Sequence, residues 1–145
     1  MNIGILGAGN IAGSMARTIC GMAAQGRPVT LYAVASRSQE KADAFAKAYG
    51  IPRAYGSYAV MLNDPLVELV YIATPHSHHA EQIRQCVAAG KPVLCEKSFT
   101  ANAKQAEDVL RAAETAGVYV AEAIWTRYMP ARGLIADILA SGDIG

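Results

Sequence analysis

The sequence predicts an α/β fold, a doubly wound parallel sheet covered by helices on both faces. Short apolar runs alternate with segments of helical periodicity along the whole chain, which is typical of strand–helix–strand units. The apolar runs contain few polar residues, as expected for strands that are buried on both faces. The expected strands are residues 3–6, 29–35, 53–55, 67–73, 92–95 and 118–121.

Helices are expected between these strands, at residues 10–24, 38–49, 57–63, 77–89, 102–116 and 130–140. Small polar residues precede several of them and favour the start of a helix, because their side chains accept hydrogen bonds from its first N–H groups. The expected caps are Ser38, Ser77 and Asn102. Glycines end several helices, at Gly26, Gly50, Gly90 and Gly117. Pro130 is well placed in a first helical turn.

Composition indicates one globular domain spanning residues 1–145. Hydrophobic residues make up 52% of the chain and charged residues 17%, and the net charge is +1, so nothing points to nucleic acid or an anionic membrane as a partner. Neither a transmembrane helix nor a signal peptide is predicted. The three cysteines, Cys20, Cys86 and Cys95, form no CxxC pair. They are interpreted as buried thiols of a cytoplasmic protein.

A glycine motif follows the first strand and opens the first helix, with the sequence Gly7-Ala8-Gly9-Asn10-Ile11-Ala12. In a G-x-G-x-x-A motif the first glycine allows a tight turn and the second lets a pyrophosphate approach the backbone. The small last residue allows the helix to pack closely on the strand. This context predicts a Rossmann-type dinucleotide site; the alternative is a glycine turn without a ligand.

The end of the second strand favours NADP over NAD as the cofactor. No Asp or Glu precedes Glu40, so the carboxylate that commonly holds the ribose 2′-hydroxyl of NAD is missing. Instead, Ser36 and Arg37 stand at the strand end and Lys41 follows. A guanidinium suits a 2′-phosphate by its charge and by its fork of donors. The alternative is a solvated arginine with loose cofactor preference.

Histidines follow the fourth strand, in the run Ala73-Thr74-Pro75-His76-Ser77-His78-His79. Metal binding is not expected, because the other strand ends offer no matching cluster of ligands. Thr74 and Pro75 are expected to wall the nicotinamide ribose instead. His76 and His79 are expected at the edge of a substrate pocket, whereas His78 is compatible with an ordinary exposed histidine.

The fifth and sixth strands are also followed by charged and aromatic residues. Glu96 and Lys97 come after the fifth strand, where a desolvated lysine with a lowered pKa can relay a proton. A surface ion pair explains them equally well. Trp125 and Arg127 follow the sixth strand and suit the rim of a substrate pocket, but also a packed connection.

Together these motifs resemble the Gfo/Idh/MocA family of NAD(P)-dependent oxidoreductases. The matching segments are GAGNIA at 7–12, ASRS at 35–38, the run at 57–82, AAGKPVLCEKS at 88–98 and EAIWTRYMP at 122–130. The resemblance covers essentially the whole chain. Within the family, it is greatest to the NADP-dependent branch of dimeric dihydrodiol dehydrogenases and xylose dehydrogenases.

The resemblance implies hydride transfer between NADP(H) and a secondary alcohol of a sugar or cyclic diol. It gives Lys97 a contact to the substrate hydroxyl, Glu96 a place on the cofactor side, and His76 and His79 places near the nicotinamide and the pocket mouth. The family motif E-K-P reads Glu96-Lys97-Ser98 here, so serine replaces the usual proline. The resemblance also implies a homo-oligomeric full-length protein.

Family members are more than twice as long as this chain, and residues 122–145 are expected to lead toward their second, β-sheet domain. The Gly-Asp-Ile-Gly sequence at 142–145 matches the turn that precedes that domain. We therefore expect this chain alone to be inactive. Two other classes of protein share parts of this pattern. A non-catalytic NADP(H) sensor would not need Lys97, and a short-chain dehydrogenase would need a Y-x-x-x-K pair that the chain lacks.

Overall fold

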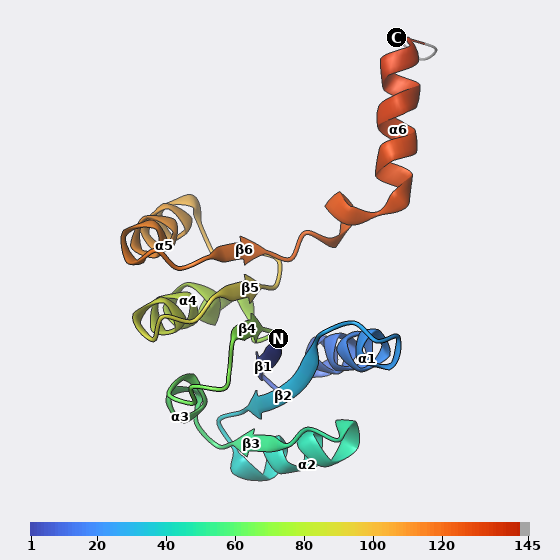
Figure 1. Ribbon diagram of the computed structural model, residues 1–145. Helices are drawn as coiled ribbons and strands as arrows, with labels where there is room; N and C mark the ends of the chain where they lie inside the picture. The colour runs from blue at the N-terminus through green and yellow to red at the C-terminus, as the bar shows by residue number, and fades with distance from the viewer. Residues whose placement is uncertain (143–145) are drawn as a thin grey trace.

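The computed structural model describes residues 1–142 and contains one sheet of six parallel strands in the order β3-β2-β1-β4-β5-β6 (Figure 1). The strands are β1 (Asn2–Leu6), β2 (Thr30–Ala35), β3 (Arg53–Tyr55), β4 (Leu69–Ile72), β5 (Val93–Cys95) and β6 (Val120–Glu122). This confirms the predicted α/β fold and all of the predicted strands. The strand order reverses between β1 and β4, and ligands of such sheets bind at the carboxyl ends of the strands beside this point.

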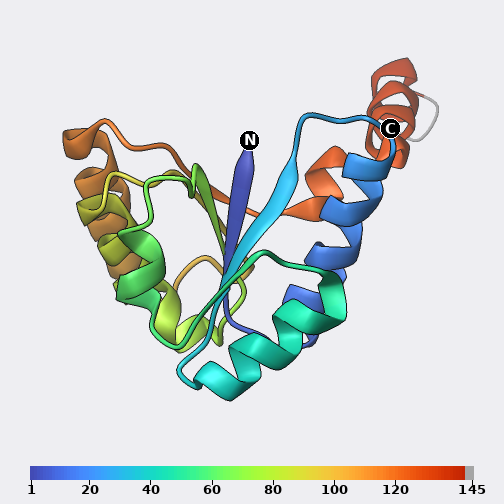
Figure 2. The same ribbon diagram turned by 60° about the horizontal axis from the view of Figure 1, so that its bottom comes forward.

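Helices cover both faces of the sheet. The helices are α1 (Asn10–Ala24), α2 (Gln39–Tyr49), α3 (Tyr58–Leu62), α4 (His79–Ala88), α5 (Ala103–Ala116) and α6 (Pro130–Ser141). Two 3₁₀ turns, η1 (His76–His78) and η2 (Trp125–Tyr128), precede α4 and α6. Figure 2 shows α1 and α2 on one face, and α3, α4 and α5 on the other.

The core consists of two apolar layers, one on each face of the sheet. Alternation along a strand sends successive side chains to opposite faces, so Ile5 joins the α1 layer and Leu6 the α4 layer. The first layer includes Ile5, Ala16, Ile19, Val34 and Phe45. The second includes Leu6, Ile72, Ile83, Val93 and Val109. Full burial of one such aliphatic side chain contributes roughly 1.5–3 kcal/mol, so these layers fix the positions of the strand ends.

Local signals at the helix ends are mostly confirmed. The Ser38 side chain accepts a hydrogen bond from the Lys41 N–H, and the Asn102 side chain accepts one from Gln105 N–H. The predicted cap at Ser77 is wrong. The chain after Pro75 forms the η1 turn, in which His78 N–H donates to the Pro75 carbonyl at 2.9 Å, and α4 begins only at His79.

The last elements stand apart from the sheet. Figure 1 shows α6 projecting beyond η2, away from the other helices. Its apolar side chains are exposed, namely Leu134, Ile135, Ile138 and Leu139. Gly142 ends α6 with a left-handed backbone, and the rest of the turn expected at 142–145 lies outside the described residues. None of the helices within residues 1–142 has the length and apolarity needed to cross a bilayer.

The cysteines do not share one environment. Cys86 and Cys95 are buried as predicted, and burial raises the pKa of each thiol to about 12. The prediction that Cys20 is buried is wrong, because it lies on an exposed position of α1.

Candidate functional site

The glycine loop lies at the strand-order reversal and has the shape that a phosphate requires. Gly7 has φ +103°, and a Cβ at this position would lie 2.9 Å from the Ala73 carbonyl oxygen. A Cβ added to Gly9, in contrast, would meet nothing within 4 Å, so the backbone there faces open space. No side chain of the described residues caps α1. Its first N–H groups therefore remain open to an anion, which the helix dipole also favours.

The residues around the loop hold α1 against the sheet. Ala12 is completely buried, which confirms the close helix–strand packing expected of a small residue there. Ala8, Gly9 and Asn10 line an adjoining cavity of about 370 Å³, together with residues of α1 and α2.

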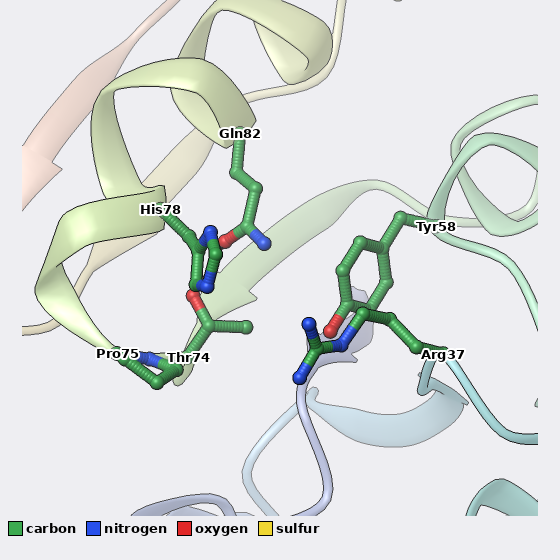
Figure 3. Close-up of a pocket in the computed structure, with 6 residues that line it drawn as sticks. All are labelled: Arg37, Tyr58, Thr74, Pro75, His78 and Gln82. Atoms are coloured by element: carbon green, nitrogen blue, oxygen red, sulfur yellow. Dashed lines mark hydrogen bonds between the residues drawn. The ribbon is translucent and has the colours of Figure 1, made fainter.

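A second cavity, of about 60 Å³, lies beside the carboxyl end of β2. Its walls are Arg37, Tyr58, Thr74, Pro75, His78 and Gln82. Figure 3 shows Arg37 and Tyr58 on one side of this recess and the other four residues facing them. Thr74 Oγ1 donates to Gln82 Oε1 at 2.5 Å, and this bond orients the Gln82 amide with its Nε2 toward the recess. We call this cavity the arginine recess.

Two other residues expected near the 2′-phosphate lie outside the arginine recess. Lys41 is exposed in the first turn of α2 and is absent from the recess walls. Ser36 is 8% exposed, and its hydroxyl accepts a hydrogen bond from Ser38 N–H at 3.4 Å. The structure thus brings Arg37, but not Lys41 or Ser36, to the recess.

A third cavity, of about 180 Å³, lies over the ends of β4 and β5. It is lined by Ile11, Ala73, Thr74, Pro75, His76, Glu96 and Lys97. The structure therefore brings together seven of the residues predicted to bind the cofactor, and Thr74 and Pro75 are shared with the arginine recess. We call this cavity the Glu96 cavity.

The Glu96 carboxylate has both oxygens engaged. Tyr71, from β4, donates its hydroxyl hydrogen to Oε1, and the Lys97 backbone N–H donates to Oε2 at 3.1 Å. Tyr71 is 2% exposed. Burial, followed by the hydrogen bond to Glu96, raises the pKa of Tyr71 far above its ordinary value, so this hydroxyl remains a donor at all ordinary pH values.

Lys97 lies on a loop that is fixed from three directions. His79 contacts the Ser98 carbonyl at 2.9 Å, Phe99 N–H donates to Glu122 Oε1 at 2.7 Å, and the Cys95 thiol lies 3.8 Å from the Phe99 carbonyl. Of the two alternatives for Lys97, a desolvated and a solvent-exposed side chain, the described residues show the exposed one. These contacts fix the backbone position of Lys97 but leave its ammonium group in solvent.

The prediction that His79 faces a substrate pocket is wrong. His79 is 0% exposed, and its Nδ1 and Nε2 lie 2.9 and 2.8 Å from the carbonyl oxygens of Ser98 and Thr74. As the first residue of α4, it points into the protein and joins the loop after β4 to the loop after β5. With both ring nitrogens engaged, it has no free atom for a substrate, so its role here is to position these loops.

The remaining predicted pocket residues lie outside the three cavities described above. Trp125 is 64% exposed, and Arg127 is exposed in the same η2 turn. Neither lines any of the three cavities described above. Within residues 1–142 there is no group of three His, Cys, Asp or Glu side chains arranged to hold a metal ion.

Comparison with known proteins places the chain in a family. Residues 1–124 match the family model Gfo/Idh/MocA, described as an oxidoreductase family with an NAD-binding Rossmann fold. The chain belongs to the Gfo/Idh/MocA family. This confirms the resemblance inferred from the motifs.

Similar proteins include sugar and diol dehydrogenases. The chain is 40% identical over 142 residues to mouse trans-1,2-dihydrobenzene-1,2-diol dehydrogenase, which covers 98% of this chain and 42% of that protein. It is 37% identical to D-xylose 1-dehydrogenase (NADP(+)) of Hypocrea jecorina, over 98% of this chain and 38% of that protein. The chain therefore spans about two fifths of the length of these relatives.

Solved structures agree with this assignment. An NAD binding oxidoreductase from Klebsiella pneumoniae superimposes with a TM-score of 0.87 at 35% identity, over 100% of this chain and 40% of that one. The 3-ketoreductase KijD10 from Actinomadura kijaniata, in complex with TDP-benzene and NADP, gives a TM-score of 0.90 at 29% identity, over 100% of this chain and 45% of that one.

Several residues of the candidate site were missed from the sequence. Tyr58 and Gln82 line the arginine recess, as does His78, which had been assigned no role. Tyr71 holds Glu96. Only Tyr71 carried a usable signal, since it is a hydroxyl-bearing residue inside an otherwise apolar strand.

Proposed function

We propose that this chain is the NADP(H)-binding part of an oxidoreductase that transfers hydride between NADP(H) and a secondary alcohol of a sugar or cyclic diol. One observation carries the proposal: Arg37 after β2, the open glycine loop after β1 and Glu96 after β5 lie in that order along the carboxyl edge of one sheet, and Thr74 and Pro75 after β4 line the cavities at both ends. A dinucleotide has the same order of parts, with adenosine, pyrophosphate and nicotinamide in a row. The chemistry that a bound nicotinamide supplies is reversible hydride acceptance.

The arginine recess supports NADP as the preferred cofactor. Arg37 is exposed at its wall and, within residues 1–142, takes part in no ion pair, so a 2′-phosphate would meet an unpaired guanidinium. No acidic residue precedes Glu40 to repel that phosphate. Among similar proteins, the xylose dehydrogenase is named for NADP(+), and KijD10 was crystallised with NADP.

Lys97 and His76 line the Glu96 cavity and supply its polar, exposed rim. We propose that the Lys97 ammonium donates a hydrogen bond to the reacting hydroxyl or carbonyl oxygen, and so stabilises negative charge that develops on this oxygen. The relatives named above act on a diol and on a sugar, which supports the same substrate class for this chain. A sensor without catalytic function leaves Lys97 without a role, and no observation favours it.

Calorimetric titration of this chain with NADP, NAD and 2′,5′-ADP tests the proposal. We expect NADP to bind more tightly than NAD, and 2′,5′-ADP to bind through the arginine recess alone. Equal affinities for NADP and NAD would contradict the proposed cofactor. Absence of binding by all three ligands would contradict the function itself.

We also propose that the full-length protein is a homo-oligomer. The exposed apolar side chains of α6 and η2, which include Trp125 and Ile138, are the support for this, because such patches commonly mark interaction surfaces. Light scattering on the full-length protein would test it, and a monomer at micromolar concentration would contradict it.

A further inference from the structure

We infer that Tyr71 and Glu96 together make this site bind the oxidised nicotinamide cofactor more tightly than the reduced one. In this inference, which rests on the proposed function, Glu96 supplies a fixed negative charge beside the nicotinamide. Tyr71 is a positioning residue, which acts through Glu96.

The position of the nicotinamide follows from the order of the cavities. The guanidinium-bearing wall of the arginine recess, Arg37, lies at the end of β2, and the open glycine loop follows β1. If the 2′-phosphate and the pyrophosphate occupy these two places, the other half of the dinucleotide must extend over β4 and β5. The cavity at that point is the one lined by Glu96, with Ile11 and Ala73 beside it.

The geometry around Glu96 holds its carboxylate in one orientation. Tyr71 and Leu94 are paired across β4 and β5, so Glu96, two residues after Leu94, projects from the same face as Tyr71 and beyond it. The Tyr71 hydroxyl donates to Oε1, and the Lys97 backbone N–H donates to Oε2. Because both donors come from rigidly placed groups, the carboxylate cannot turn away from the cavity without losing a hydrogen bond.

Glu96 has no ion-pair partner among the described residues, and Lys97, which lines the same cavity, is exposed to solvent. Within residues 1–142, no Lys, Arg or His side chain forms an ion pair with Glu96 at 4.0 Å or less. Both of its hydrogen-bond donors are neutral groups, which hold an anion in place without removing its charge. The high pKa of Tyr71 also means that Tyr71 does not become a competing anion.

The two redox forms of the cofactor respond differently to such a charge. The oxidised nicotinamide ring carries one positive charge, and this charge disappears when a hydride, which is one proton with two electrons, adds to the ring. A nearby carboxylate therefore attracts the oxidised ring and has no comparable interaction with the reduced one. By linkage, tighter binding of the oxidised form lowers the reduction potential of the bound cofactor.

The test is the ratio of two dissociation constants, Kd for NADPH divided by Kd for NADP⁺, measured by calorimetry on this chain. Glu96→Gln removes the charge and keeps the shape, and we expect it to lower the ratio by about tenfold. For a two-electron couple, tenfold corresponds to about 30 mV in the potential of the bound cofactor. Tyr71→Phe keeps the ring but frees the carboxylate, and we expect a decrease of a few fold in the same direction.

The control is a second tyrosine–carboxylate pair far from this cavity. Tyr55 donates to Asp64 Oδ2 at 2.7 Å, and neither residue lines the Glu96 cavity. Tyr55→Phe should leave the ratio unchanged. The affinity for 2′,5′-ADP, which lacks a nicotinamide, should be unchanged in all three variants.

The outcomes separate the inference from the proposed function. If the wild-type chain does not bind 2′,5′-ADP or NADP⁺, the proposed function fails, and the inference fails with it. If these ligands bind and Glu96→Gln leaves the ratio unchanged, or weakens both redox forms equally, the inference alone is overturned. If Glu96→Gln lowers the ratio but a folded Tyr71→Phe does not, the positioning role of Tyr71 is wrong. Should Tyr71→Phe fail to fold, Glu96→Gln still decides the role of the charge.

Discussion

The two ends of the candidate site differ in how their charged side chains are held. At the end of β2, Arg37 is exposed, and among the described residues it has no ion-pair partner, so the arginine recess depends on one free charge. At the end of β5, Glu96 is held by Tyr71 and by the backbone of Lys97. The loop that follows Glu96 and carries Lys97 is held by contacts with His79 and Glu122.

This difference indicates where single substitutions should act independently. A free charge can be removed without disturbing its neighbours, so changes at Arg37 should alter cofactor choice and little else. Side chains at the other end share hydrogen-bond partners, and such groups show coupled effects when they are substituted. Changes there should alter the orientation of the nicotinamide and of Lys97 together.

The largest effect is expected at the reaction end. In a chain extended through a second domain, as in the longer relatives, Lys97→Met should lower kcat by about 10²–10³-fold, the usual cost of removing one donor that stabilises developing negative charge. Lys104→Met, on an exposed position of α5, is the control and should change nothing. Absorbance of NADPH with sugars and cyclic diols as substrates measures both. Wild-type turnover by Lys97→Met would remove this lysine from the mechanism.

The chain of 145 residues by itself should bind cofactor with negligible turnover. The residues that line the Glu96 cavity come only from α1 and from the segments after β4 and β5, so they contact a substrate from one side, and positioning of the substrate contributes much of an enzyme's rate. Turnover by this chain comparable with that of its longer relatives would show that the reaction end is complete without further residues.

At the adenosine end, Arg37→Ala should weaken NADP binding by roughly 1–3 kcal/mol, the scale of a hydrogen bond to a charged group. NAD has no 2′-phosphate, so its affinity should change little. Arg111→Ala, on an exposed position of α5, is the matched control. An equal loss for NADP and NAD in a titration would mean that Arg37 contacts a part that the two cofactors share.

The glycine loop lies between the two ends of the site. We expect substitution of Gly7 to affect stability and substitution of Gly9 to affect cofactor binding. Gly7→Ala should lower the free energy of unfolding by about 1–3 kcal/mol, because φ is +103° and the new Cβ would meet the Ala73 carbonyl. Gly9→Ala meets open space, so it should leave stability unchanged yet weaken cofactor binding by intruding on the pyrophosphate. Urea unfolding and titration of both variants measure this. Unimpaired NADP binding by Gly9→Ala would place the pyrophosphate elsewhere.

The strands and most helix ends could be predicted from the sequence because they depend on local signals. Apolar runs specify strands, and Ser38 and Asn102 specify helix starts through their own side chains. Ser77 is not a cap because it lies inside the 3₁₀ turn that follows Pro75, in which His78 N–H donates to the Pro75 carbonyl. The position of Arg37 followed from the rule that ligands bind at the carboxyl ends of parallel strands.

The direction in which a side chain points could not be predicted. His79 and His76 lie three residues apart, yet His76 lines the Glu96 cavity and His79 is buried between two carbonyl groups. The bond from Tyr71 to Glu96 depends on the pairing of β4 with β5, which no local pattern contains. The exposure of Lys97 likewise depends on how its loop is anchored to α4 and β6.

The smallest expected effect compares the two tyrosine–carboxylate pairs at alkaline pH. Burial and the bond to Asp64 raise the pKa of Tyr55 from 10.0 to about 12, and burial and Glu96 raise that of Tyr71 further. The folded state therefore holds both phenolic protons more tightly than the unfolded state. Their stabilising contribution is fully present below pH 10 and is lost as the pH rises through the folded pKa values. The free energy of unfolding in urea should thus decline above pH 10.

The buried thiols of Cys86 and Cys95, whose pKa values are also about 12, add to this decline from pH 9 upward, so only differences between variants are informative. Between pH 10 and about 12 the two variants should flatten the decline equally, because each tyrosine is then protonated in the folded state and ionised in the unfolded state. Near pH 12, where Tyr55 loses its proton in the folded state, Tyr71→Phe should flatten the decline more than Tyr55→Phe, because Tyr71 is 2% exposed whereas Tyr55 is only partly buried. Equal flattening by both variants near pH 12 as well would mean that the two folded-state pKa values are similar and that the two pairs are equally solvated. In that case the carboxylate of Glu96 would be screened by water, and the contrast between the two ends of the site would be smaller than their hydrogen bonds indicate.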